Sequence, residues 1–309
     1  MRFPLSGEER LQNPGGRLRL LWQERSYIIM PGVYNALLAR LVQFYGFDAV
    51  YISGAGVTNS LLGLPDHAFI TLPEMAQVCS YITSVISIPA VADADTGYGE
   101  VLQVARAVQM LERAGLSGIH IEDQVNPKRC GHLEGKELIS TEQMVAKIRA
   151  AVQARENPDF VIIARTDARA VEGLQGAIDR ARAYADAGAD AIFPEALQSP
   201  DEFERFARAV SLPLMANMTE FGKTPYLTAR EFAQLGYKMI IFPMTLLRVM
   251  MKAAENALQT LKELGTQQPL LEGMQTRAEL YELLEYDRFL AFDRALQGGE
   301  PPSEPKKLL

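Results

Sequence analysis

The stretch Ala90-Val91-Ala92-Asp93-Ala94-Asp95-Thr96-Gly97-Tyr98-Gly99 shows the pattern that repeats along this chain. Its apolar run over 90–94 is typical of a buried strand, and its two carboxylates share a face because side chains alternate along a strand. A helical pattern then covers 101–114, and a second apolar run over 118–122 ends in Glu122-Asp123. This unit predicts parallel strands whose ends carry acidic groups.

The same alternation of strand and helix patterns extends in both directions from this unit. Short β-rich runs predict strands at Ile28–Met30, Ala49–Ile52, Ala90–Ala94, Gly118–Glu122, Phe160–Arg165, Ala191–Pro194, Pro213–Ala216 and Met239–Phe242. The helical patterns between them include Asn35–Tyr45, Val101–Ala114, Glu142–Arg155, Glu172–Ala187 and Ala229–Leu235. Eight such pairs in about 250 residues predict an α/β protein with a (β/α)8 TIM barrel. A doubly wound sheet would need a glycine-rich phosphate loop after its first strand, and Met30–Asn35 is not one.

Polar side chains follow the predicted strands at the same end. They are Ser53, Asp93 with Asp95, Glu122 with Asp123, Arg165 with Asp167, Glu195, Asn217 with Thr219 and, just beyond the eighth strand, Arg248. Catalytic groups of a TIM barrel gather at the carboxyl ends of its strands. The pattern therefore predicts one shared pocket and an enzyme.

Composition narrows the class of protein. The 309 residues are 48% hydrophobic and 22% charged, as in an ordinary globular protein, and the net charge of −7 argues against a nucleic acid or an anionic membrane as partner. No apolar run reaches the roughly 18 residues of a membrane span. Two cysteines, Cys79 and Cys130, cannot form a disulfide framework. We expect a cytoplasmic, single-domain protein over 1–309, with the barrel at about 26–265.

The run Lys128-Arg129-Cys130-Gly131-His132 predicts a reactive thiol. Neighbouring positive charge lowers the pKa of a thiol, which makes Cys130 a candidate proton donor, whereas Cys79 is expected to be inert core. The loop at about 124–138 is expected to open and close. Its residues Glu134, Lys136 and Glu137 are expected to form a solvated face.

Two helical patterns follow the predicted barrel, at Met244–Leu264 and Thr276–Leu296. A barrel needs only one closing helix, so the second pattern is surplus and its apolar side chains require a partner surface. We expect a helical extension at about 274–297 and a disordered tail from Gly298 to Leu309.

These motifs resemble the isocitrate lyase/phosphoenolpyruvate mutase superfamily. The likeness runs from about Met30 to Phe292 and includes the segments 53–56, 62–66, 93–99, 121–124, 128–132, 164–168, 193–196, 217–222 and 274–277. The cysteine-bearing motif is typical of the carbon–carbon lyases of the superfamily, and its mutases and decarboxylases lack it. Ala55 stands where a glycine is common, and the backbone can still approach a ligand there.

The resemblance implies an activity, a cofactor and an assembly. The activity is Mg2+-dependent cleavage of (2S,3R)-2-methylisocitrate, a small tricarboxylate, into pyruvate and succinate in the methylcitrate cycle of propionate catabolism, with Mn2+ as an alternative metal. The assembly is a homotetramer of dimers that exchange their last helix. Three alternatives stay open: cleavage of isocitrate, whose enzymes are usually longer; a mutase, phosphonate hydrolase or decarboxylase acting on a small oxo acid; and a non-enzymatic scaffold.

The resemblance also assigns roles to residues. Cys130 would be the catalytic acid, with Tyr51 as candidate base and His132 beside them. Asp93, Asp95 and Glu122 would hold the metal, some through water, with Asp66 as an outer member. The substrate would contact Ser53, Gly54, Ala55, Gly131, Arg165, Glu195, Asn217, Met218, Thr219, Arg248 and Arg277. Arg165 beside Asp167 has a structural ion pair as its alternative. Phe193, Ile241 and Pro243 are nominated to hold the extra methyl group.

Overall fold

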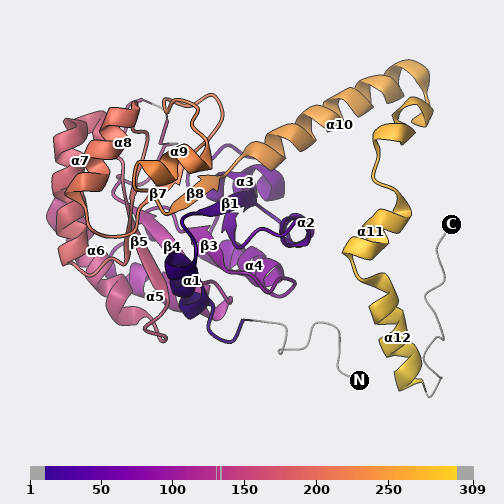
Figure 1. Cartoon of the computed structure of the whole chain (residues 1–309), viewed down its shortest axis with the longest axis horizontal. Coiled ribbons are helices and arrows are strands. Elements are labelled where there is room, and N and C mark those ends of the chain that lie inside the picture. Colours follow the sequence, from indigo (N-terminus) through magenta and orange to yellow (C-terminus); the bar gives the residue numbers. More distant parts are fainter. Residues whose placement is uncertain (1–10, 130, 133, 298–309) are drawn as a thin grey trace.

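Eight parallel strands form a barrel in the computed structural model, which describes residues 11–129, 131–132 and 134–297 (Figure 1). The strands are β1 (Ile28–Val33), β2 (Val50–Ile52), β3 (Ala90–Asp93), β4 (Gly118–Glu122), β5 (Val161–Thr166), β6 (Ala191–Pro194), β7 (Met215–Asn217) and β8 (Met239–Phe242). They pair in the order β6-β5-β4-β3-β2-β1-β8-β7, and a bridge between Ile192 and Leu214 joins the two ends. The predicted TIM barrel is therefore confirmed, and an open doubly wound sheet is excluded.

Strand and helix alternate along the chain, and the helices before β8 surround the barrel, whereas those after it extend away from it. They are α1 (Pro14–Glu24), α2 (Ala36–Phe44), α3 (Gly54–Val57), the π-helix η1 (Thr58–Leu62), α4 (Leu72–Thr83), α5 (Val101–Arg113), α6 (Thr141–Ala154), α7 (Arg169–Asp186), α8 (Pro200–Ala209), α9 (Ala229–Gln234), α10 (Thr245–Leu264), the 3-10 helix η2 (Gln268–Gly273), α11 (Arg277–Leu283) and α12 (Tyr286–Leu296). Capping boxes at Ser140, Thr228 and Thr276 satisfy the first backbone N–H groups of α6, α9 and α11.

The barrel interior is a packed core that α1 closes at the amino ends of the strands. Leu18 and Leu21 of this helix join a buried cluster with Met30, Ile163 and Met239 from inside the barrel. A second, larger cluster fills the layer between the strands and the surrounding helices. The sequence patterns did not predict α1, which begins at Pro14 after an Asn13 cap.

The chain after β8 leaves the barrel. Helix α10 projects from it, none of its residues is buried, and apolar side chains such as Val249, Met251 and Leu258 are exposed (Figure 1). Across the described residues, no helix is long and apolar enough to cross a membrane. The expected disorder of 298–309 lies outside the described residues.

The prediction of one helix over Thr276–Leu296 is wrong, because the structure has two. Helix α11 ends before Leu284, and Glu285 takes a left-handed backbone with φ of 54°. Arg40 of α2 explains the break: its Nη1 donates to the Leu283 carbonyl at 3.3 Å and pairs with Glu285 Oε2 at 3.0 Å. A continuous helix would need that carbonyl for its own hydrogen bond.

Candidate active site

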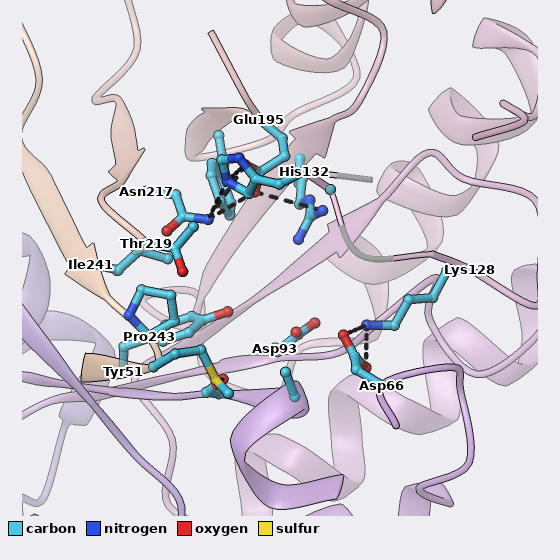
Figure 2. Close-up of a pocket in the computed structure, with 16 residues that line it drawn as sticks. Tyr51, Asp66, Asp93, Lys128, His132, Glu195, Asn217, Thr219, Ile241 and Pro243 are labelled. Carbon is cyan, nitrogen blue, oxygen red and sulfur yellow. Dashed lines mark hydrogen bonds and ion pairs between the residues drawn. The ribbon is translucent and has the colours of Figure 1, made fainter. Parts of the chain in front are cut away.

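One pocket opens at the carboxyl ends of the barrel strands (Figure 2). Its lining comes from strand ends and the loops that follow them: Tyr51, Ser53, Ala55, Asp66, Asp93, Lys128, Gly131, His132, Arg165, Phe193, Glu195, Asn217, Thr219, Ile241, Pro243 and Met244. The pocket predicted from the polar strand ends is therefore present. Its walls differ in character: one is acidic, one combines cations with hydrogen-bonding groups, and one is apolar.

The acidic wall is built by β3, β4 and the segment after η1. Asp93 lies at the end of β3, and Gly54 approaches it so closely that a Cβ on Gly54 would lie 2.7 Å from Asp93 Oδ2. The Lys128 ammonium lies among the carboxylates, 2.7 Å from Asp66 Oδ1 and 3.0 Å from Asp95 Oδ1. Glu122 is buried beneath them. Lys128 was predicted only to acidify the thiol, and its place among the carboxylates was missed.

The acidic wall carries buried oxygen atoms that accept no hydrogen bond. Asp95 Oδ1 and Glu122 Oε2 have only an ion-pair contact, with Lys128 and Arg165, and Glu122 Oε1 has neither kind of partner. Burial raises the pKa of Asp95 to about 6 and the pKa of Glu122 well above its usual range. Within the described ranges, no three His, Cys, Asp or Glu side chains converge closely enough to hold a metal ion directly. Oxygen donors at this spacing fit Mg2+, which keeps several waters between itself and the protein.

Tyr51 and His120 form a buried pair on the floor of the pocket. The Tyr51 hydroxyl and His120 Nε2 lie 2.8 Å apart. Burial lowers the pKa of His120 to about 4, which leaves the ring neutral at pH 7, and burial raises the pKa of Tyr51 well above 10. His120 Nδ1 has no hydrogen bond. The phenol is therefore protonated at neutral pH, and a base role for Tyr51 requires a neighbour that takes its proton.

Arg165 links the acidic wall to the opposite wall. Its Nη1 is 3.2 Å from Glu122 Oε2, and its Nε donates to Asp167 Oδ2 at 2.9 Å. The guanidinium also lies over the Phe193 ring, 5.2 Å from its centroid. The structural ion pair with Asp167 is thus present, and it holds Arg165 in place while Arg165 lines the pocket.

The opposite wall is a hydrogen-bonded cluster around Glu195. His132 Nε2 is 2.9 Å from Glu195 Oε1, and Asn217 Nδ2 donates to Glu195 Oε2 at 3.2 Å. Burial opposes ionisation of Glu195, but Arg165 and His132 outweigh it and hold the pKa of Glu195 far below its usual range. The backbone N–H of Lys223 donates to His132 Nδ1 at 3.0 Å. His132, Glu195 and Asn217 thus lie together over the pocket (Figure 2).

The loop after β4 lies against this cluster. Gln124 ties its base by donating to the Arg129 carbonyl at 2.9 Å and accepting from the Arg129 N–H at 3.0 Å. A Cβ on Gly131 would lie 2.4 Å from Glu195 Cγ, so only a glycine fits there. The expectation that Lys136 faces solvent is wrong: Lys136 is buried beneath the loop. Cys130 lies outside the described residues.

Of the remaining predicted residues, some line the pocket and some do not. Ser53, Ala55 and Thr219 line the pocket, as do the three residues nominated for a methyl group, and Met244 joins them without having been predicted. Met218 is buried outside the lining. The side chain of Arg248 is 46% exposed and reaches Glu220 Oε2 at 3.4 Å. Arg277 is the first residue of α11 and is not among the residues that line the pocket.

Comparison with known proteins places the chain in a family. The model of the phosphoenolpyruvate phosphomutase family matches residues 18–262. The chain belongs to this family. Among phosphomutase-family relatives, the 2-methylisocitrate lyase of Aeropyrum pernix is 54% identical over 278 residues, which cover 90% of this chain and 89% of the relative.

Solved structures of other enzymes share the fold. A 2,3-dimethylmalate lyase superposes with a TM-score of 0.88 at 38% identity, covering 96% of this chain and 100% of that one. A phosphonopyruvate hydrolase in complex with oxalate and Mg2+ gives 0.82 at 29% identity, covering 93% and 99%. One structural neighbour of this chain therefore contains Mg2+.

Proposed function

We propose that this chain is a carbon–carbon lyase that cleaves (2S,3R)-2-methylisocitrate into pyruvate and succinate with Mg2+ as cofactor. One observation carries the proposal. A single pocket joins an acidic wall with buried oxygen atoms that accept no hydrogen bond, a cationic and hydrogen-bonding wall, and an apolar patch, in a chain 54% identical to a 2-methylisocitrate lyase. A tricarboxylate with one extra methyl group needs all three surfaces.

The cleavage is of the retro-aldol type. The substrate hydroxyl loses its proton, the adjacent C–C bond breaks to give pyruvate, and the electron pair passes to a succinate carbanion that must gain a proton. Asp93, Asp95 and Glu122, with Asp66 outside them, are the residues that would hold Mg2+ through direct and water-mediated contacts. When bound, the ion supplies acidification of the hydroxyl and neutralisation of developing charge.

The chain's own residues bind the substrate and move its protons. Arg165 presents a guanidinium to a substrate carboxylate, and His132, Asn217, Thr219 and Ser53 provide further hydrogen bonds. Cys130 is the acid that delivers a proton to the carbanion. On the floor, Tyr51 receives the hydroxyl proton only as its own proton passes to the neutral His120 at 2.8 Å.

The apolar patch supports methylisocitrate over isocitrate. Phe193, Ile241 and Pro243 line the pocket, and Phe193 and Ile241 are fully buried. One methyl group in such a site is worth about 10- to 200-fold in kcat/KM. Turnover of the two substrates with Mg2+ tests the proposal: we expect kcat/KM for 2-methylisocitrate to be at least about 10-fold higher. Higher efficiency with isocitrate would make the chain an isocitrate lyase instead.

The assembly proposed for the enzyme is a cytoplasmic homotetramer of helix-swapped dimers, with one domain per chain: a barrel at about 26–265 and an extension at about 274–297. The exposed apolar side chains of α10 support this assembly, since a second copy would cover them. A swapped arm would also bring Arg277 of one chain toward another chain.

A further inference from the structure

Lys136 is a buried lysine that the reaction described above does not use. Its side chain is 1% exposed, and its Nζ lies 2.9 Å from Oδ1 of the equally buried Asp167. The same ammonium donates to the carbonyl of Gly131, five residues earlier in the loop. Burying an ammonium costs free energy unless acceptors replace the lost water, so these two contacts must form together for the loop to lie as it does.

Asp167 is a fixed point at the end of β5. Its backbone N–H donates to Asp123 Oδ1 at 2.9 Å, and its carboxylate accepts from Arg165 Nε at 2.9 Å and Nη2 at 3.2 Å. One carboxylate therefore serves a loop lysine and a pocket arginine. Although burial opposes ionisation, Arg165 and Lys136 hold the pKa of Asp167 below its usual range.

Gly131, whose carbonyl accepts from Lys136, lies directly against Arg165 of the pocket. A Cβ on Gly131 would lie 2.5 Å from Arg165 Nη2, so its backbone rests on the guanidinium. The next residue, His132, is 2.9 Å from Glu195 Oε1. The carbonyl that Lys136 holds thus belongs to the part of the loop that contacts both Arg165 and the Glu195 cluster.

We propose that Lys136 is a positioning residue that fastens Gly131 and His132 over Arg165 by bridging the Gly131 carbonyl to Asp167. A compact ammonium suits this role because it can donate to a carbonyl and a carboxylate at once. When the loop lifts, Lys136 leaves Asp167, and that carboxylate neutralises Arg165 alone. Loop closure and the availability of the Arg165 guanidinium to a substrate carboxylate are therefore coupled. The effect on turnover rests on the proposed lyase function, whereas the effect on the loop does not.

The test compares Lys136→Met, which keeps the length of the side chain without its charge, with Lys136→Arg, which keeps the charge. We expect Lys136→Met to lower kcat for 2-methylisocitrate about 10²-fold, with a much smaller change in KM, because a small misplacement of reacting groups costs this much. Lys136→Arg should recover part of kcat. Glu137→Gln, an exposed change in the same loop, is the matched control and should behave as wild type.

Hydrogen exchange gives a readout that needs no turnover. Peptides over 128–138 should exchange faster in Lys136→Met than in wild type, and succinate with pyruvate and Mg2+ should protect them only in wild type and Lys136→Arg. Barrel peptides should be unchanged. If Lys136→Met leaves both kcat and loop exchange as in wild type, the proposal is overturned. Faster exchange throughout the barrel, with Arg and Met equally inactive, overturns it too, since Lys136 would then support only the fold. A wild-type chain without lyase activity refutes the proposed function, and loop exchange still tests Lys136.

Discussion

The acidic wall and the Glu195 wall of the pocket differ in how far positive side chains neutralise their carboxylates. On the Glu195 side, the carboxylates of Glu195 and Asp167 have Arg165 and Lys136 beside them, and His132 and Asn217 also contact Glu195. On the acidic side, Asp66, Asp93, Asp95 and Glu122 face one lysine, Lys128, and part of Arg165. Negative charge is therefore in excess on one wall only. A cation is expected there, whereas the other wall can receive an anion only by sharing Arg165.

Removing the cation from the acidic wall should have the largest effect. Excess chelator should abolish cleavage of 2-methylisocitrate, and added Mg2+ should restore it in the wild type. Asp93→Ala should abolish Mg2+ binding measured by calorimetry and should not regain activity, because its carboxylate lies at a strand end that faces the pocket. Full activity in excess chelator would show that the charge excess has another purpose.

Removing the proposed acid from the loop should have the next largest effect on turnover. Cys130→Ser should lower kcat about 10²- to 10⁴-fold, the range associated with one positioned proton donor, because a serine hydroxyl is a much weaker acid than a thiol. Binding of succinate and pyruvate, followed by calorimetry, should be nearly unchanged. Turnover within a few-fold of wild type would show that Cys130 is not the acid. The two walls of the pocket would then differ only in their charge.

The smallest expected effect on activity is that of replacing Cys79, whose thiol should be far less reactive than that of Cys130. Burial raises the pKa of Cys79 to about 12, so its thiol stays protonated, and therefore unreactive, at pH 8. An aromatic disulfide reagent should modify one thiol per native chain, and Cys130→Ser should remove that reaction. Cys79→Ala should keep it, with activity close to wild type. Modification of Cys79 in the folded protein would show that α4 opens readily.

The barrel and the acidic wall could be predicted because both depend on local pattern. The bounds of β4, β6 and β8 agree with the predicted runs, and alternation along β4 puts Glu122 on the same face as His120, which pairs in register with Asp93. The loop could not be predicted in this way. Lys136 lies next to Glu137 in a polar run, and only Asp167, at the end of another strand, makes its burial favourable.

The C-terminal arm shows the same limit. The apolar spacing over 276–296 is helical throughout, so the sequence predicts one helix. The break at Glu285 depends on Arg40, which α2 brings to the Leu283 carbonyl across a long stretch of chain. Local periodicity carries no information about such a partner. The same holds for α1, because Leu18 and Leu21 are buried only by packing against the barrel interior.

Helix α1 also affects how substrate enters the pocket and how the products leave it. Because Leu18 and Leu21 are buried with the barrel-interior side chains, α1 closes the amino ends of the strands, and the pocket lies at the opposite end, beside the loop. Substrate must therefore enter, and two products must leave, at the carboxyl ends of the strands. We therefore expect the fragment nearer the opening to leave first, so that the two products are released in a fixed order.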